Sequence, residues 1–350
     1  MRQNILDLTL DRLSSWCSER ELKRYVPPQV YQWLYSKKVV SFEEMTNIAV
    51  ETRALFAEYF YIGRLEVGAR HHSQVDQSRK YLFRLQDGRS IESVLMPQKN
   101  RLTLCVSSQV GCAMGCKFCK TAEMKLVRNL TQGEILGQIL EVWRELSPGT
   151  RISNIVLMGM GEPLHNYDNL LSSIRIMTDD RGLGISQRKI TVSTVGLAPE
   201  IERFANDSGV KLALSLNATT EEGRQNLMPI TKKYSLERVI EACKKYTELQ
   251  PKRRVTLEYV MMAGINDSLE DAKRLARIGS HIPCKINLIP YNEYPASPFQ
   301  RPSEEKVGLF FHYLADRHFQ VNIRYSKGLD VMGACGQLCV NPGIPSPVTT

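Results

Sequence analysis

After residue 100, short apolar segments alternate with longer amphipathic segments, and this alternation restricts the fold more than any other feature of the chain. The apolar segments are 102–106 (LTLCV), 154–158 (NIVLM), 189–193 (KITVS), 211–216 (KLALSL), 254–260 (RVTLEYV) and 285–289 (KINLI). Helical spacing is found at 131–146, 167–178, 197–206, 235–249 and 268–279, and a last helix and strand are expected at 303–318 and 320–325. This pattern predicts an α/β fold with a parallel sheet, either open or curved into a partial barrel. In both cases ligands bind at the carboxyl ends of the strands.

The first 97 residues have a different organisation. Segments 9–19, 28–36 and 41–56 have apolar residues at helical spacing, and Ser41 followed by Glu44 resembles a capping box. From about residue 61 the period changes to two, and the pair Asp87–Gly88 is typical of a hairpin turn. We therefore expect a helical domain at 1–60, a β-ribbon linker at 61–97, a barrel at 98–330 and a C-terminal segment with a loose tail at 331–350.

Composition excludes several classes of protein. The chain has 350 residues, of which 43% are hydrophobic and 24% charged, so it is neither disordered nor fibrous. No apolar run approaches the ~18 residues needed to span a bilayer, and charges near the N-terminus are unlike a signal peptide, so we expect a cytoplasmic protein. The net charge is +9, with six basic residues and one acidic residue between 98 and 128. This favours a polyanionic partner, although a solvated basic surface explains the charge equally well.

Cysteine placement points to a metal centre. The nine cysteines are an odd number in a large chain, which argues against a disulfide framework. Cys112, Cys116 and Cys119 form a C-x3-C-x2-C pattern directly after the first predicted strand. Three thiolates in one loop can hold a 4Fe-4S cluster and leave the fourth iron open to a small chelating molecule. The alternatives are a zinc site completed by Cys105 or a distant residue, and a chance cluster of core cysteines.

The cysteine pattern resembles the signature of the radical S-adenosylmethionine (SAM) superfamily. Four further motifs resemble the RlmN/Cfr family, whose members methylate an aromatic carbon of adenosine in RNA: CVSSQVGC (105–112), GMGEP (159–163), LIPYN (288–292) and ACGQL (334–338). The resemblance covers nearly the whole chain. It implies a partial (β/α)6 radical SAM barrel, preceded by a helical domain that serves as an RNA-binding accessory.

The resemblance also implies roles for single residues. It implies that Cys112, Cys116 and Cys119 hold the cluster, and that Cys335 carries the methyl group and Cys105 resolves the protein–RNA adduct through a transient disulfide. Glu92 matches the proton acceptor. The SAM-binding positions are Gly161, Glu162, Ser193, Ser215, Leu216, Asn217 and Asn292. From the residues alone, Cys105 is equally well a buried small side chain, Glu92 an ordinary ribbon residue, and Cys339 a rival for the resolving role.

The implied reaction adds a methyl group to carbon 2 of adenosine in 23S rRNA, with tRNA as a further substrate, and consumes two SAM molecules per turnover. Carbon 2 lies between two ring nitrogens and has no available lone pair, so simple displacement is unfavourable and a radical route is needed. An electron donor such as flavodoxin or ferredoxin and a monomeric state are expected. The alternatives are methylation of carbon 8, a non-catalytic RNA-binding metal protein, and a redox sensor that uses Cys105 and Cys335.

The chain departs from the family pattern at a few positions near these motifs. Asn217 stands where the family commonly has His, which removes a titratable group. Lys120 replaces a small residue after the third cluster cysteine, and Lys125 replaces a more neutral residue. We expect the added positive charge to raise the cluster potential, and we expect basic groups to lower the thiol pKa of Cys105 and Cys335.

Overall fold

The computed structural model describes residues 2–295 and 297–340, so residues 341–350 of the predicted tail lie outside the described part of the chain. Its centre is a ten-stranded sheet with the order β14-β13-β12-β11-β10-β9-β6-β5-β4-β3. The parallel part consists of β6 (Arg101–Cys105), β9 (Asn154–Leu157), β10 (Ile190–Thr194), β11 (Lys211–Ser215), β12 (Val255–Met261), β13 (Cys284–Pro290) and β14 (Val321–Ile323). The six predicted strands and the final strand are therefore confirmed.

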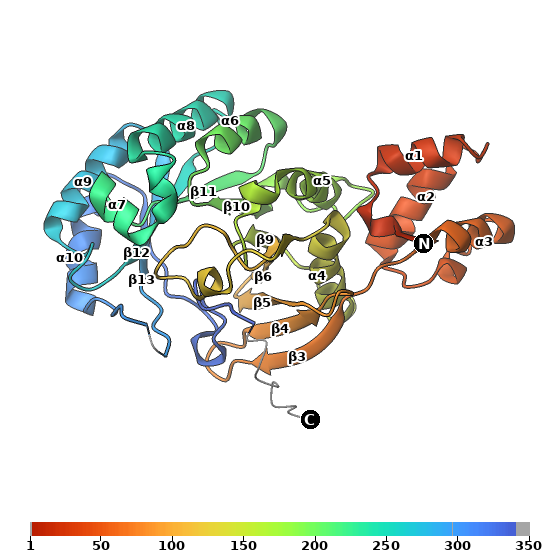
Figure 1. Ribbon diagram of the computed structural model, residues 1–350, viewed down its shortest axis with the longest axis horizontal. Coiled ribbons are helices and arrows are strands. Elements are labelled where there is room, and N and C mark those ends of the chain that lie inside the picture. The colour runs from red at the N-terminus through yellow and green to blue at the C-terminus, as the bar shows by residue number, and fades with distance from the viewer. Residues whose placement is uncertain (1, 296, 341–350) are drawn as a thin grey trace.

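Helices cover the outer side of the curved parallel sheet (Figure 1). They are α4 (Gln132–Arg144), α5 (Tyr167–Thr178), α6 (Ala198–Asp207), α7 (Glu221–Leu227), α8 (Leu236–Leu249), α9 (Leu269–Ser280) and α10 (Glu304–Ala315). In α4, Thr131 and Glu134 form a capping box, and Ile135 and Ile139 are fully buried on the side of the helix that faces the core. This arrangement is the predicted partial (β/α) barrel, although the short helix α7 had no counterpart in the predicted pattern.

The expected ribbon is continuous with the main sheet. Strands β3 (Glu66–His72), β4 (Arg79–Arg84) and β5 (Ser90–Gln98) are antiparallel, and β5 also pairs with β6. The hairpin turn at Asp87–Gly88 is confirmed, with Gly88 at φ +78°. A period of two predicts a strand but not its partner, so the pairing of β5 with the barrel could be found only in three dimensions.

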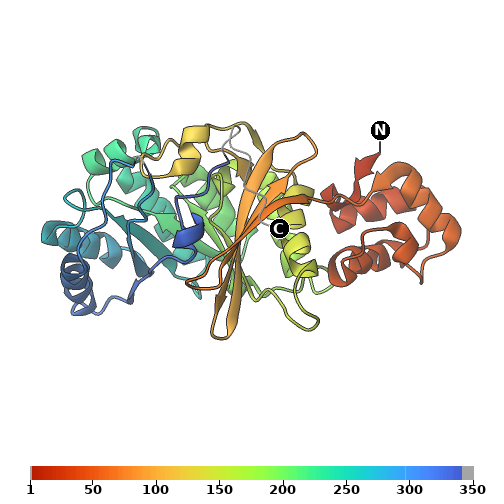
Figure 2. The same ribbon diagram turned by 90° about the horizontal axis from the view of Figure 1, so that it is seen from below.

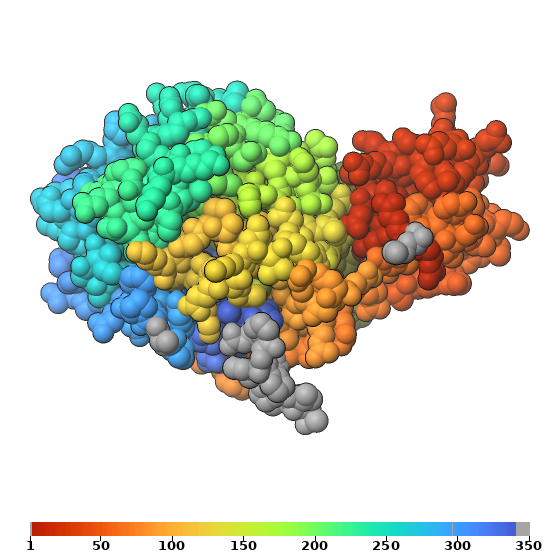
Figure 3. All heavy atoms as spheres, in the orientation of Figure 1, coloured from red at the N-terminus to blue at the C-terminus, as the bar shows by residue number. Residues whose placement is uncertain are grey.

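The N-terminal helical module stands to one side of the barrel (Figures 1, 2 and 3). It contains β1 (Gln3–Asn4), α1 (Leu10–Ser18), α2 (Val26–Gln32), a π-helical turn (Trp33–Lys37), α3 (Val50–Tyr59) and β2 (Phe60–Tyr61). The predicted helix 41–56 is wrong in its middle part: the Ser41–Glu44 capping box starts only a short turn, and α3 begins at Val50. Tertiary contacts cause this break, because Met45 and Ile48 between the two helices are buried.

The module contacts the barrel through α4. The Gln132 side chain donates to the Leu6 carbonyl at 2.7 Å, and the Gly133 amide donates to Asp7 at 2.7 Å. Among residues 2–295 and 297–340, no helix has the length and apolar character needed to cross a membrane.

Candidate active site

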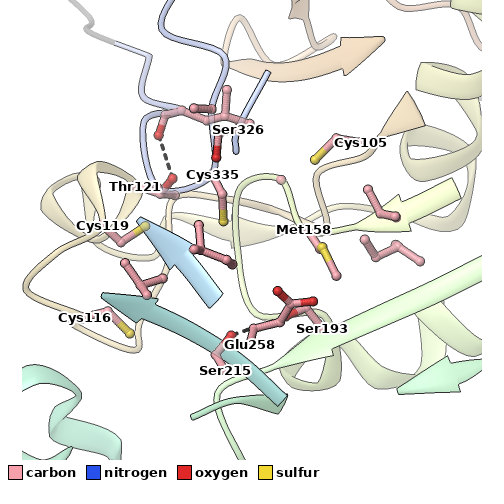
Figure 4. Close-up of a pocket in the computed structure, with 18 of the residues that line it drawn as sticks. Cys105, Cys116, Cys119, Thr121, Met158, Ser193, Ser215, Glu258, Ser326 and Cys335 are labelled. Atoms are coloured by element: carbon pink, nitrogen blue, oxygen red, sulfur yellow. Dashed lines mark hydrogen bonds between the residues drawn. The ribbon is translucent and has the colours of Figure 1, made fainter. Parts of the chain in front are cut away.

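A cavity of about 220 Å³ opens at the carboxyl ends of the parallel strands. Most of the predicted site residues line it: Cys105, Cys112, Cys116, Cys119, Gly161, Glu162, Ser193, Ser215, Asn217 and Cys335. Figure 4 shows that their side chains come from the cysteine loop, from several strand ends and from the C-terminal segment. Glu92, Leu216 and Asn292 do not line the cavity. The structure therefore brings together residues that lie up to 230 positions apart in the chain.

The cysteine loop begins after β7 (Gln109–Val110), which pairs with β8 (Arg128–Asn129) and so closes the base of the loop. Gly111 adopts φ +76°, and a Cβ there would lie 1.6 Å from the Lys125 carbonyl oxygen. Only glycine fits this position. The adjacent Cys112 amide donates to the same carbonyl at 3.1 Å, which holds the two arms of the loop together.

The loop offers the donor set of an iron–sulfur cluster. Cys112, Cys116 and Cys119 lie within eight residues of the chain, and all three line the cavity. Three thiolates can bind three irons of a 4Fe-4S cluster and leave the fourth iron accessible from the cavity.

Glu162 follows β9 in a turn that is packed against the cysteine-loop strand. A Cβ at Gly161, whose φ is +100°, would lie 2.5 Å from the Gln109 Cβ. The Glu162 side chain accepts hydrogen bonds from the Leu164 amide at 3.1 Å and the Val195 amide at 2.9 Å. Burial raises the pKa of this carboxyl to about 7, which the two amide hydrogen bonds partly oppose. The carboxylate thus caps one turn, joins two loops and still faces the cavity.

The other predicted SAM residues differ in what they contact. The hydroxyls of Ser193 and Ser215 lie 3.4 Å apart at the ends of β10 and β11, facing the cavity (Figure 4). Asn217 has φ +56°; its side chain accepts from the Val260 amide at 2.9 Å and donates to the Met228 sulfur at 3.4 Å. Its amide therefore joins two strand ends, besides lining the cavity.

Leu216 and Asn292 support the site from behind the cavity wall. Leu216 is fully buried, and its amide donates to the Glu258 carbonyl at 2.9 Å. Asn292 donates to the Cys335 carbonyl at 3.0 Å and to the Ser326 hydroxyl at 2.9 Å. Asn292 thus holds the segment that carries Cys335, while its buried Oδ1 has no hydrogen-bond partner in the described part of the chain.

Cys335 lies between Cys119 and Cys105, with its sulfur directed into the cavity (Figure 4). Two hydrogen bonds hold its segment against the cysteine loop: the Lys120 amide donates to the Gly336 carbonyl at 2.7 Å, and the Thr121 hydroxyl donates to the Leu338 carbonyl at 2.6 Å. Cys105, at the end of β6, pairs in register with Val94 and Val156. Both thiols are free, in one cavity, as the resolving role of Cys105 requires.

The expectation of lowered thiol pKa values is wrong for both cysteines. Burial raises the pKa of Cys105 to about 12, and the nearby Cys335 raises it further. Cys335 is exposed to solvent in the open cavity, yet desolvation by the neighbouring cavity walls raises the pKa of its thiol to about 11, with Cys119 and Glu258 adding to the effect. Arg324 acts in the opposite direction on both thiols, but the basic residues counted in the sequence do not outweigh desolvation.

Glu92 does not line the cavity but contacts the C-terminal segment. Its side chain is 7% exposed and forms an ion pair with Lys80 at 3.1 Å, and it accepts from the Cys339 amide at 3.1 Å. Burial raises the pKa of Glu92, and the Lys80 ammonium opposes the rise. The predicted base therefore anchors the segment that carries Cys335, and its role as proton acceptor stays a prediction.

Sequence reasoning missed Glu258, a carboxylate on β12 that lines the cavity. Its Oε1 accepts from Asn287 at 2.9 Å, whereas its Oε2 is buried without a hydrogen-bond partner in residues 2–295 and 297–340. The signal was present in the sequence, because a glutamate interrupts the apolar segment RVTLEYV (254–260). Its direction toward the cavity depends on the strand's orientation, which the sequence does not show.

Comparisons with known proteins identify the family of the chain. The family model "Radical SAM superfamily" matches residues 106–276, and "Ribosomal RNA large subunit methyltransferase N-terminal domain" matches residues 3–62. The dual-specificity RNA methyltransferase RlmN of Pelobacter propionicus is 49% identical over 338 residues, which is 96% of each chain. RlmN of Geobacter sulfurreducens is 48% identical, covering 96% of this chain and 91% of its own. A radical SAM methyltransferase from Sphaerobacter thermophilus superposes with a TM-score of 0.90 at 40% identity, covering 96% and 99% of the two chains. This chain therefore belongs to the RlmN family of radical SAM methyltransferases.

Proposed function

We propose that this protein methylates carbon 2 of adenosine in 23S rRNA and in tRNA, with Cys335 as methyl carrier and Cys105 as the residue that resolves the protein–RNA adduct. The observation that carries the proposal is the meeting of three cluster cysteines, Cys335 and Cys105 in one cavity. Relatives named dual-specificity RNA methyltransferases, similar over nearly the full chain, support the same substrates. Nothing observed favours carbon 8, a non-catalytic metal protein or a redox sensor.

The cofactors follow from the donor set. Cys112, Cys116 and Cys119 would hold a 4Fe-4S cluster, which supplies the single electron that cleaves SAM and so opens a radical route to an unreactive ring carbon. Glu162 would accept a hydrogen bond from the amino group of SAM, and the hydroxyls of Ser193 and Ser215 offer further polar contacts. Two SAM molecules would be used per turnover, one for Cys335 and one for the radical step.

The chain's own residues would position Cys335 and prepare the adduct for release. Asn292 and the cysteine loop hold the Cys335 segment in place through hydrogen bonds to its backbone. Cys105 would attack the Cys335 sulfur and form the transient disulfide; the bond between that sulfur and the carbon attached to the base breaks, and the carbon keeps the electron pair and takes a proton to become the methyl group. Glu92 would take the proton that restores the aromatic ring, which requires a rearrangement of the site because Glu92 does not line the cavity in this structure.

The opening of the cavity suits RNA. Arg324, Tyr325 and Lys327 line it, and the Tyr325 side chain is 53% exposed. Basic and aromatic side chains at a cavity mouth are typical of proteins that bind an unstacked base and its phosphates. We assign the helical module at 1–60 the role of RNA-binding accessory domain. A flavodoxin or ferredoxin as electron donor, a monomeric state and a cytoplasmic location complete the proposal.

Anaerobic reconstitution with iron, sulfide, SAM, a reductant and an rRNA fragment or tRNA tests the function. We expect 5′-deoxyadenosine in the supernatant and 2-methyladenosine in the digested RNA, both detected by mass spectrometry. Cys335→Ala is the control, which should retain the cluster but form no methylated base. A methyl group on carbon 8, or methylation by Cys335→Ala, would show that the proposed reaction is wrong.

A further inference from the structure

Arg224 in α7 is a fully buried cation, with 0% of the residue exposed. A charged side chain is almost never buried in this way unless an opposite charge compensates it. None of the ion pairs formed within residues 2–295 and 297–340 includes Arg224. The acidic residues nearest in sequence are Glu222 and Glu221, and the Glu221 carboxylate accepts hydrogen bonds from Gln225 and from the Leu236 amide. The buried positive charge is therefore uncompensated by a paired carboxylate in this described part of the chain.

The hydrogen bonds of Arg224 all go to neutral oxygens. Its guanidinium donates to the Leu216 carbonyl at 3.3 Å, to the Ser215 carbonyl at 3.4 Å, to the Val195 carbonyl and to the Thr231 hydroxyl at 2.7 Å. Three of these acceptors lie at the ends of β10 and β11, beside the residues proposed to bind SAM. Arg224 thus ties two strand ends together, but carbonyl and hydroxyl dipoles do not neutralise its charge.

The chain around Arg224 packs against the cysteine loop. The Lys117 amide, next to Cys116, donates to the Leu227 carbonyl at the end of α7 at 3.0 Å. A Cβ placed on Gly115 would lie 3.6 Å from the Cγ of Pro229, so the loop backbone packs closely against this proline. The anion that Arg224 lacks is therefore the one expected at this loop.

We propose that Arg224 is the buried counter-charge of the iron–sulfur cluster, and that its guanidinium also positions the ends of β10 and β11. A 4Fe-4S cluster held by three thiolates is anionic, and one-electron reduction adds a further negative charge. A fixed positive charge in the protein interior stabilises the reduced form more than the oxidised form and so raises the reduction potential. This inference rests on the proposed function, because it requires the cluster to be present.

The test compares cluster potentials by anaerobic redox titration, followed by visible absorption and electron paramagnetic resonance. Arg224→Gln removes the charge, and we expect the one-electron equilibrium to shift at least tenfold against reduction, which is about 59 mV. Arg224→Lys keeps the charge and should shift the equilibrium less than threefold. Thr231→Val is the matched control, since it removes one hydrogen bond of Arg224 without changing the charge; it should lower the melting temperature and leave the potential unchanged.

The outcomes separate the two roles. An Arg224→Gln protein with an intact cluster and an unchanged potential would overturn the proposal, as would equal shifts in the Gln and Lys variants. If Arg224→Gln does not fold, Arg224→Lys decides, because a tenfold shift despite the retained charge contradicts an electrostatic role. An unsubstituted protein that binds no cluster would refute the proposed function as well. If the unsubstituted enzyme is active but Arg224→Gln leaves the cluster potential unchanged, only the role of Arg224 is refuted.

Discussion

The pH dependence of SAM binding should report the ionisation of Glu162. Burial raises the pKa of this carboxyl to about 7 in the ligand-free protein, and only the ionised form accepts hydrogen bonds from an amino group with both oxygens. A carboxyl with a raised pKa loses its proton as pH rises. The affinity for SAM should therefore increase with pH through 7 and approach its upper limit about one pH unit above the pKa.

The size of the effect follows from the ionised fraction. With a pKa of about 7, roughly 3% of the Glu162 side chains are ionised at pH 5.5 and about half at pH 7. The apparent dissociation constant should then fall about 15-fold between these pH values, because it scales inversely with the competent fraction. This range lies below the ordinary α-amino pKa of about 7.7–8.0, so the charge of the ligand changes little.

Equilibrium dialysis of SAM against cluster-loaded protein under argon measures the affinity, with iron content as a check at each pH. Glu162→Gln cannot ionise, so its affinity should be lower at pH 7 and should vary less than threefold between pH 5.5 and 7. SAM is titrated into the unsubstituted protein and into the Glu162→Gln variant in the same buffers, and the two sets of dissociation constants are compared. If the dissociation constant of SAM changed equally with pH in the unsubstituted protein and in the Glu162→Gln variant, the reasoning would be refuted, because the titrating group would then be elsewhere.

Three further predictions concern the site and its support. Cys105→Ala should accumulate a covalent protein–RNA adduct, visible as a shifted band in denaturing gels; continued turnover without adduct would remove Cys105 from the reaction. Gly159→Ala places a Cβ 2.8 Å from the Ser107 amide nitrogen and should lower the free energy of unfolding in urea by about 1–3 kcal/mol. Lys120→Ala should lower the cluster potential, although less than Arg224→Gln because Lys120 is partly exposed and screened by solvent; an unchanged potential would reject the hypothesis.

Local patterns predicted the secondary structure well where one periodicity extends over a whole element. The helix expected at 167–178 is α5 at its full length, and the strand expected at 285–289 is the core of β13. The pattern was misleading at 41–56, where a helical spacing continues across a break between two helices. The break depends on burial of Met45 and Ile48 against other segments, which no local periodicity contains.

The electrostatic environment was the least predictable part of the site. Counting lysines and arginines near Cys105 suggested lowered thiol pKa values, but burial raises them because desolvation acts on the thiolate from all sides. Similarly, Glu92 looked like a half-exposed ribbon residue, yet it is buried in an ion pair with Lys80 and bonded to the Cys339 amide. Charge placement along a sequence does not show which charges face one another.

The sequence by itself determined that three possible metal-ligating thiols lie together, because Cys112, Cys116 and Cys119 are near neighbours in one loop and their spacing is a local property. It also predicted a parallel sheet from the alternation of strands and helices, whereas the order of the strands came from the tertiary structure. Only the tertiary structure showed that Cys335 and Cys105 line one cavity, that Glu258 lines it too, and that Arg224 is fully buried. These contacts join segments far apart in the chain, and the electrostatic effect of a buried charge depends on neighbours that only folding brings close to it.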